Sequence, residues 1–204
     1  MSRGGPKIEF NALTRSVKEI EARFLTPHLG PPTLSAPSRL ETLDVAACMV
    51  LVHGALENFV EGLAQWAFSK AVQNWIYRKK TSRVTASLLL YEQIPDDTQP
   101  SVFDNIRKSL EDAKTRMSKV VHDNHGISPN NLRALFMPLG VNVPRDPLLI
   151  ASLELLITIR HQWAHQDRNN RTKITRSAAD AQTTIADCLT FAKKLSEEVA
   201  SVRP

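Results

Sequence analysis

Residues 160–167 form the densest group of reactive side chains in the sequence. The group contains one arginine, Arg160, and two histidines, His161 and His165. A histidine can take a proton from a hydroxyl group or donate one to a leaving oxygen, because its ordinary pKa lies near neutral pH. The planar guanidinium of arginine can hold a phosphate and stabilise the negative charge of a transition state without a metal ion. These residue types therefore suit cleavage of a phosphodiester bond.

RNA carries its own nucleophile for this reaction, the 2′-hydroxyl group beside each phosphate. Its attack would leave a 2′,3′-cyclic phosphate and a free 5′-hydroxyl. Arg160 and His165 are five residues apart, which is about 140° around an α-helix. One helix face therefore cannot bring both side chains to one phosphate, and a second surface must complete the site. A second copy of the helix in a homodimer would supply that surface.

Basic residues follow the reactive group directly, and Asp167 is the only acid among them. We expect these residues to hold an RNA backbone that enters the cleft. They are Arg168, Arg171, Lys173 and Arg176. The formal net charge of +5 and the pI near 9.4 permit such a polyanionic partner without demonstrating it.

Other histidines and acids have simpler explanations. His161 and His165 share a helix face and could bind zinc, but a third ligand is missing nearby, so we expect neither a metal nor a cofactor. His122 and His125 flank a helix end, where capping and turn contacts are the ordinary role. The row formed by His53, Glu57 and Glu61 at four-residue spacing is interpreted as a solvated edge of a helix.

The elements that must position these residues are helices, because apolar residues recur at helical spacing along almost the whole chain. The fold class predicted is all-α, a compact bundle of five to seven helices. Ser38, with Glu41 three residues later, and Asp146 are predicted helix caps, and Ser128 is predicted to cap a helix that begins at Pro129. The predicted helices span residues 7–25, 38–80, 85–91, 101–122, about 129–138, 147–165 and 177–202.

A single domain is predicted over residues 1–204. Residues 1–38 supply an N-terminal helix and a loop, and residues 39–204 supply the helical core. The loop, residues 26–38, contains Gly30 and four prolines, so no regular element is expected there. Among the tryptophans, Trp163 is interpreted as part of the dimer interface, and the other two as packing residues.

Composition places the chain among ordinary globular proteins, with 204 residues of which 42% are hydrophobic and 23% charged. Cys48 and Cys188 lie in apolar helical patterns and are expected to be reduced packing residues. The N-terminus lacks the apolar region of a signal peptide. The longest apolar stretch, residues 148–159, falls short of a membrane span. We therefore expect a cytoplasmic protein without a membrane partner.

Two ordered stretches carry a resemblance to a known family. The segment Arg160-His161-Gln162-Trp163-Ala164-His165 resembles the Arg-x4–6-His motif of the HEPN superfamily, including the small residue before the histidine. Upstream lie Asn124-His125-Gly126-Ile127, then Asn131-Leu132, then Pro138-Leu139-Gly140-Val141. In order and spacing they resemble the RiboL-PSP-HEPN subgroup. The resemblance covers residues 40–192.

The resemblance implies a metal-independent endoribonuclease that dimerises and works in toxin–antitoxin, antiphage or RNA-processing settings. His165 would then be the principal acid or base, Arg160 would stabilise the transition state, and His161 would orient or assist. Glu57 matches an acidic position of the long helix and is expected to support the site. RNA would be the substrate, and a protein antitoxin or regulator a further partner. The alternative is a HEPN-like module that binds RNA or protein without cleaving RNA.

Two positions depart from the family pattern. His161 stands where an asparagine or glycine usually follows the arginine, which leaves the detailed mechanism open. Asp167 stands where the branch regulated by nucleotidylation carries a tyrosine, so that regulation is not expected.

Overall fold

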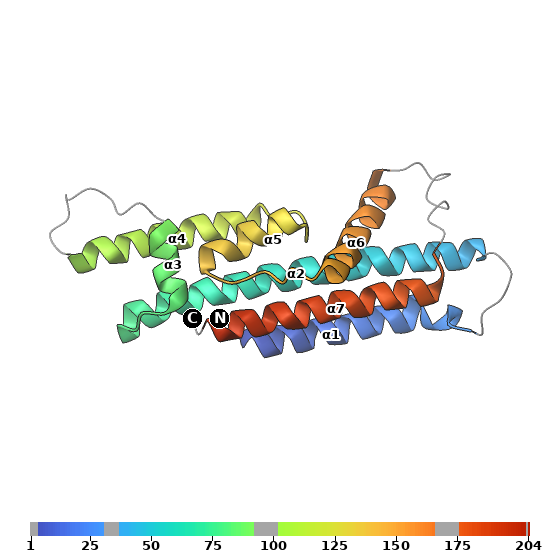
Figure 1. Cartoon of the computed structure of the whole chain (residues 1–204), viewed down its shortest axis with the longest axis horizontal. Helices are drawn as coiled ribbons and strands as arrows, with labels where there is room; N and C mark the ends of the chain where they lie inside the picture. Colours follow the sequence, from blue (N-terminus) through green and yellow to red (C-terminus); the bar gives the residue numbers. More distant parts are fainter. Residues whose placement is uncertain (1–3, 31–36, 92–101, 166–175, 203) are drawn as a thin grey trace.

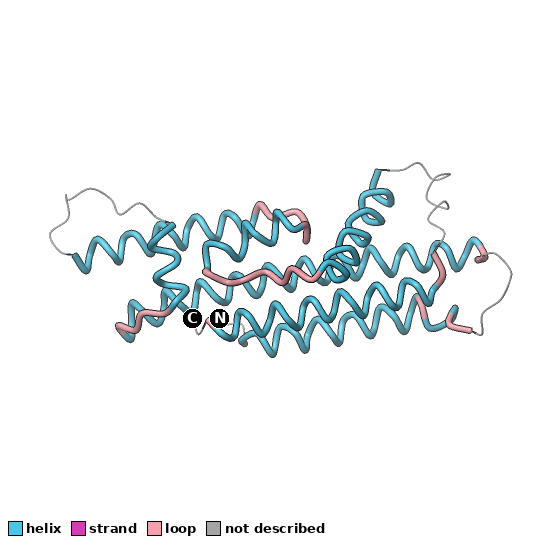
Figure 2. The backbone as a smooth tube through the Cα atoms, viewed as in Figure 1, coloured by secondary structure: helices cyan, strands magenta, loops and turns pink. Residues whose placement is uncertain are grey.

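The computed structural model describes residues 4–30, 37–91, 102–165, 176–202 and 204. Within these residues the structure contains helices and loops but no strand (Figure 2). The all-α prediction is therefore confirmed. The elements are α1 (Gly5–Phe24), η1 (Thr26–His28), α2 (Arg39–Arg78), α3 (Arg83–Tyr91), α4 (Val102–His122), α5 (Pro129–Phe136), η2 (Met137–Leu139), α6 (Pro147–His165) and α7 (Ala178–Ser201).

The helices are arranged around α2, the longest element. Helices α1, α2 and α7 run side by side along the long axis of the molecule (Figure 1). Helix α4 also packs on α2, while α3, α5 and η2 form a small group beside it. Helix α6 crosses α2 steeply, and its C-terminal end rises away from α2 and α7 (Figure 1). The Arg/His segment therefore lies on the projecting end of a helix.

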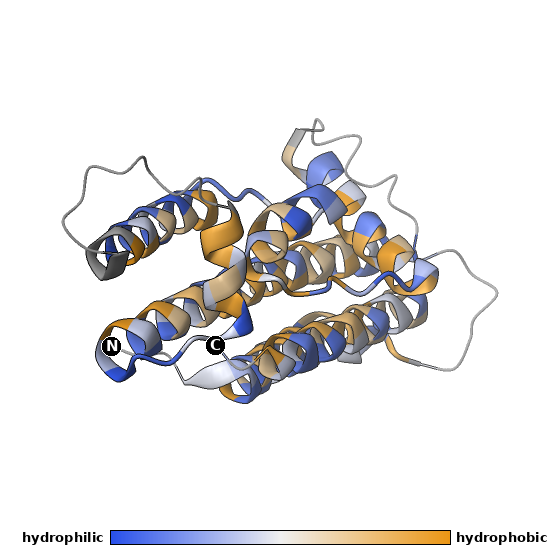
Figure 3. Cartoon of the chain, turned by 60° about the vertical axis from the view of Figure 1, so that its left-hand side comes forward, coloured by the Kyte–Doolittle hydropathy of each residue, from blue (hydrophilic) through white to orange (hydrophobic). Residues whose placement is uncertain are grey.

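Helix α2 lies at the centre because it is apolar on nearly all sides. Residues such as Met49, Leu63 and Phe68 are fully buried. Figure 3 shows hydrophobic and hydrophilic strips alternating along the helices, as expected for amphipathic helices around one core. By length and composition α2 could cross a membrane, but half of its most apolar window is buried in the bundle. A helix buried in the core of a bundle has the same high hydropathy as a membrane-spanning helix.

The helix starts follow the predicted caps. The side chains of Ser38 and Ser128 accept hydrogen bonds from the backbone N–H groups of the third residues after them, at 3.1 and 3.2 Å. Asp146 Oδ1 accepts one from the N–H of Leu148 at 3.2 Å. These bonds satisfy donors that the first helical turn leaves unpaired. The predicted starts of α2, α5 and α6 are thereby confirmed.

The first half of α6 is tied to α7 by side chains. Ser152 donates a hydrogen bond to Asp187 at 2.8 Å. Lys194 forms an ion pair with Asp146, just before α6, at 3.2 Å. Nearer the other end, Trp163 is half-buried and packs against the core. Helix α6 is therefore tied to α7 through its N-terminal half and packed on the core through its inner face.

The prediction of no regular element in residues 26–38 was wrong at its start, where η1 forms. Proline fits the first turn of a helix because its fixed φ is already helical, and Pro27 occupies that position. His28 Nε2 lies 2.8 Å from Asp44 Oδ2 of α2, and this contact ties the turn to the bundle. Residues 31–36 of the same segment lie outside the described part of the chain.

Both cysteines are free and buried, as predicted. Burial raises the pKa of the Cys48 and Cys188 thiols to about 12, with smaller contributions from Glu21 and Asp187. The reactive form of a cysteine is the thiolate, so these two are packing residues.

Candidate active site

One side of the candidate site is formed by a row of polar residues on α2, namely His53, Glu57 and Glu61. The side chain of His53 is only 1% exposed, and that of Glu57, one turn later, is 19% exposed. The prediction that this row is solvated was therefore wrong for His53. The reason is tertiary, because the loop between α4 and α5 and the nearby α6 cover this side of α2.

The α4–α5 loop is held against this row by one side-chain hydrogen bond and by the close approach of Gly126. Asn124 Nδ2 donates a hydrogen bond to Glu61 Oε1 at 2.8 Å. Asn131 Nδ2 donates one to the carbonyl of Gly126 at 3.3 Å. Gly126 has a φ of +142°, which favours glycine, and a Cβ at this position would lie 3.8 Å from His53 Nε2. The stretch from Asn124 to Ile127, which carries part of the family resemblance, therefore packs against α2.

Arg160, on α6, also lies near this row of α2. Its positive charge acts on His53 and on Glu57, while its own side chain remains exposed. Burial, and then the charge of Arg160, lower the pKa of His53 to about 4. His53 is therefore neutral near pH 7.

Glu57 is at the centre of this charge cluster. Burial raises its pKa, Arg160 and His125 act to lower it, and Glu61 acts to raise it further. Glu57 Oε2 lies 3.9 Å from His53 Nδ1, a buried nitrogen without a hydrogen-bond partner within the described residues. The carboxylate of Glu57 thus lies next to His53, and the charges of Arg160 and His125 act on it. The expected supporting role of Glu57 stays a prediction.

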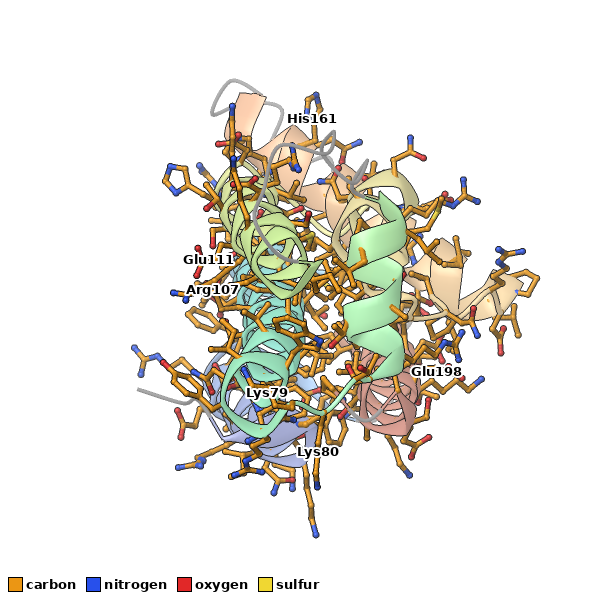
Figure 4. The ribbon with its side chains drawn as sticks, turned by 90° about the vertical axis from the view of Figure 1, so that its left-hand side faces the viewer. Lys79, Lys80, Arg107, Glu111, His161 and Glu198 are labelled. Atoms are coloured by element: carbon orange, nitrogen blue, oxygen red, sulfur yellow. The ribbon has the colours of Figure 1, made fainter. Side chains whose placement is uncertain are left out.

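The other predicted catalytic residues follow Arg160 on α6. His161 is exposed and lies at the projecting end of the helix, at the upper edge of Figure 4. Helix α6 continues to His165, so the separation of about 140° from Arg160 that the spacing predicts applies to the backbone. The side chain of His165 lies outside the described part of the structure. The expected convergence of Arg160 and His165 from two chains of a dimer therefore stays a prediction.

Of the four basic residues expected to hold RNA, only Arg176 belongs to the described residues, where it is half-buried just before α7. Arg168, Arg171 and Lys173 lie outside them. No three His, Cys, Asp or Glu side chains in the described ranges are grouped closely enough to hold a metal ion.

A groove of about 850 Å³ adjoins the site between α1, α2 and α4. Glu61 belongs to both the groove and the candidate site, because it lines the groove and accepts the hydrogen bond of Asn124. The charged side chains that line the groove are two acids, Glu9 and Glu61, and two bases, Lys70 and Lys114. The groove is therefore not a positively charged surface.

The buried, neutral His53 makes a prediction about stability. An unfolded histidine has a pKa of about 6.5, whereas the pKa of His53 in the folded chain is about 4. Below pH 6.5 the unfolded chain therefore binds a proton that the folded chain does not, so stability is lost as the pH falls toward 4. Between about pH 7 and about pH 4.5, we expect the free energy of unfolding of the wild type to fall by about 2–3 kcal/mol more than that of His53→Gln.

Urea unfolding of both proteins at the two pH values would measure this difference. The raised pKa of Glu57 acts in the opposite direction, but it is present in both proteins, so the comparison isolates His53. Equal losses in the two proteins would show that His53 is not buried in its neutral form.

The sequence signal for this arrangement was present but ambiguous. Polar residues at every fourth position of an otherwise apolar helix can mark a wet edge or a buried site. Asn124 and Glu61 are 63 residues apart in the chain, so their pairing depends on the tertiary fold. The sequence reasoning therefore found Arg160 and Glu57, but missed the roles of His53, Glu61 and Asn124.

The all-α bundle, with an Arg-x4-His segment at the end of a helix that crosses the longest one, defines a domain of the HEPN class. The family model RiboL-PSP-HEPN matches residues 21–201, so the chain belongs to the RiboL-PSP-HEPN family. The superfamily is one of nucleases and RNA-binding domains. The match begins inside α1, before the predicted boundary at residue 40. No curated protein and no solved structure matches the chain.

Proposed function

We propose that this chain is a metal-independent endoribonuclease of HEPN type. The observation that carries the proposal is the position of Arg160. It lies on α6, the helix that ends in His165, and its charge acts on Glu57 and His53 of α2. A fixed positive charge next to a histidine is what cleavage of a phosphodiester needs when no metal takes part.

In the proposed reaction, His165 takes the proton from the 2′-hydroxyl of RNA. The 2′-oxygen attacks the neighbouring phosphorus atom, and the bond from phosphorus to the 5′-oxygen breaks. Arg160 stabilises the negative charge that develops on the phosphate oxygens. His161 orients the substrate or assists proton transfer. The 5′-oxygen takes up a proton, and the products are a 2′,3′-cyclic phosphate and a free 5′-hydroxyl.

RNA is proposed to approach the projecting end of α6. Arg168, Arg171, Lys173 and Arg176 follow this end in the sequence and would bind the phosphate backbone. The balanced charges of the groove between α1, α2 and α4 argue against an RNA path on that side.

The proposed active form is a cytoplasmic homodimer. Since Arg160 and His165 are five residues apart, about 140° around α6, a second copy of α6 would bring the arginine of one chain to the histidine of its partner. A toxin of this kind also needs a neutralising antitoxin or a regulator, and antiphage defence or RNA processing are the proposed settings.

A second candidate function is a HEPN domain that binds RNA or protein without cleaving RNA. His161 favours it, because this histidine replaces the usual asparagine or glycine after the arginine. The basic residues after α6 and the dimer surface would serve binding equally well.

The test is incubation of the purified full chain with mixed cellular RNA in the presence of EDTA. Wild type is expected to give fragments that end in 2′,3′-cyclic phosphate, and His165→Ala about 100-fold less of them. Intact RNA that is nevertheless bound by the wild type would refute the enzyme and support the binding module. Fragments that disappear with EDTA would refute the metal-independent mechanism.

A further inference from the structure

His125 occupies an unusual place in the α4–α5 loop. The residue before it, Asn124, is hydrogen-bonded to Glu61, and the residue after it, Gly126, is buried against His53. His125 itself is exposed. The backbone is thus fixed on both sides of a histidine whose own side chain faces solvent.

The start of α5 does not depend on His125. Ser128, and not His125, accepts the hydrogen bond from the first turn of α5. The packing contacts of the loop are made by Gly126 and Ile127, which are both buried. The side chain of His125 is therefore presented at the surface by a loop that other residues hold in place.

The surface at which His125 lies is the candidate active site. The neighbours of His125 meet α2 one turn on either side of Glu57, because Asn124 binds Glu61 at 2.8 Å and Gly126 lies beside His53. The loop therefore places His125 opposite Glu57, and the charges of His125 and Arg160 both act on that carboxylate. His53, the second histidine of this cluster, is buried and cannot reach a substrate. His125 is accordingly the histidine beside Glu57 that a bound phosphate could contact.

We propose that His125 is a further catalytic residue, the general acid that protonates the leaving 5′-oxygen of RNA. This inference rests on the proposed ribonuclease function. While His165 takes the proton of the 2′-hydroxyl and the new bond from the 2′-oxygen to phosphorus forms, the imidazolium of His125 donates its proton to the 5′-oxygen as the old bond breaks. Exchange of protons with water then restores both histidines.

The role supplies the second proton-transfer group that the reaction needs. Transesterification moves one proton to the enzyme and another from it, so it uses two proton-transfer groups in opposite states. His125 and His165 come from different elements, α4–α5 and α6. Glu57, held between Arg160 and His125, would position both cations around the phosphate.

The test uses an RNA oligonucleotide that the wild type cuts in mixed cellular RNA, and the same oligonucleotide with sulfur in place of the scissile 5′-oxygen. A thiolate is a far better leaving group than an alkoxide and needs no proton donor, because thiols are much stronger acids. We expect His125→Ala to cut the natural RNA about 100-fold more slowly than wild type. On the sulfur-containing RNA its rate should lie within about threefold of the wild-type rate.

Two comparisons make the test specific. Arg160→Ala should be slow on both substrates, since its charge acts on the phosphate and not on the leaving group. His122→Ala removes another exposed histidine, at the end of α4, and should behave as wild type on both. Circular dichroism of all variants would verify that they fold.

The outcomes separate the two proposals. If wild type cuts and His125→Ala cuts natural RNA equally fast, or is equally slow on both substrates, the role of His125 falls while the ribonuclease stands. If the folded wild type cuts no RNA at all, the ribonuclease falls, and the role of His125 falls with it.

Discussion

Replacement of Arg160 with alanine is expected to lower the rate of RNA cleavage about 1000-fold, the largest effect we expect from a single site residue. The guanidinium is exposed at the end of α6, yet its charge reaches both His53 and Glu57. Its exposed side chain can therefore contact a phosphate at the place where its charge acts on α2. Removal of this charge leaves the developing oxyanion without its main partner. The rate with saturating RNA would measure the loss.

Arg160→Lys separates charge from geometry. Lysine keeps the charge but lacks the planar fork that holds two phosphate oxygens, so we expect it to recover about one tenth of the wild-type rate. Arg107→Ala is the matched control, because Arg107 is an exposed arginine that pairs with Glu111 on α4 at 3.2 Å, away from the site (Figure 4). Equal losses in Arg160→Ala and Arg107→Ala would reduce the role of Arg160 to net charge.

Phe68→Ala is expected to destabilise the fold by about 3–5 kcal/mol. Phe68 is fully buried in α2, at the centre of the bundle. Its removal would lose apolar contacts and leave a cavity that rigid neighbouring helices fill only in part. Since a domain of this size is stable by only about 5–15 kcal/mol, this variant should approach the limit of folding. The midpoint of urea unfolding would measure the loss.

Tyr77→Ala is the control for that experiment. Tyr77 is an aromatic residue of the same helix, but its side chain is 80% exposed. We expect its loss to change the free energy of unfolding by less than about 0.5 kcal/mol. A small effect at Phe68, comparable to that at Tyr77, would contradict the central position of α2 in the core.

The helices could be predicted from the sequence because their signals are local. Ser38, Ser128 and Asp146 mark helix starts within a few residues, and apolar spacing marks the lengths. The short η1 was missed because the prolines around Pro27 were interpreted as breakers, although proline is compatible with a first helical turn.

The candidate site could be predicted only where its residues lie close in sequence. Arg160 and His165 belong to one helix, so their spacing alone made them candidates. His53 and Arg160, in contrast, come from different helices, and Asn124 meets Glu61 only in the folded chain. No periodic pattern reports such a contact, and so the row on α2 was taken for a solvated edge.

The attachment of α6 makes the position of Arg160 sensitive to small tilts of the helix. Ser152 and Asp146 tie its first half to α7, whereas Arg160 lies eight residues beyond Ser152, about 12 Å along the helix axis. A tilt of about 5° at Ser152 would move Arg160 by about 1 Å, and misplacement of that size can cost a reaction about 100-fold in rate. A protein that binds the outer end of α6 and tilts the helix would therefore lower the rate of the proposed reaction without entering the site.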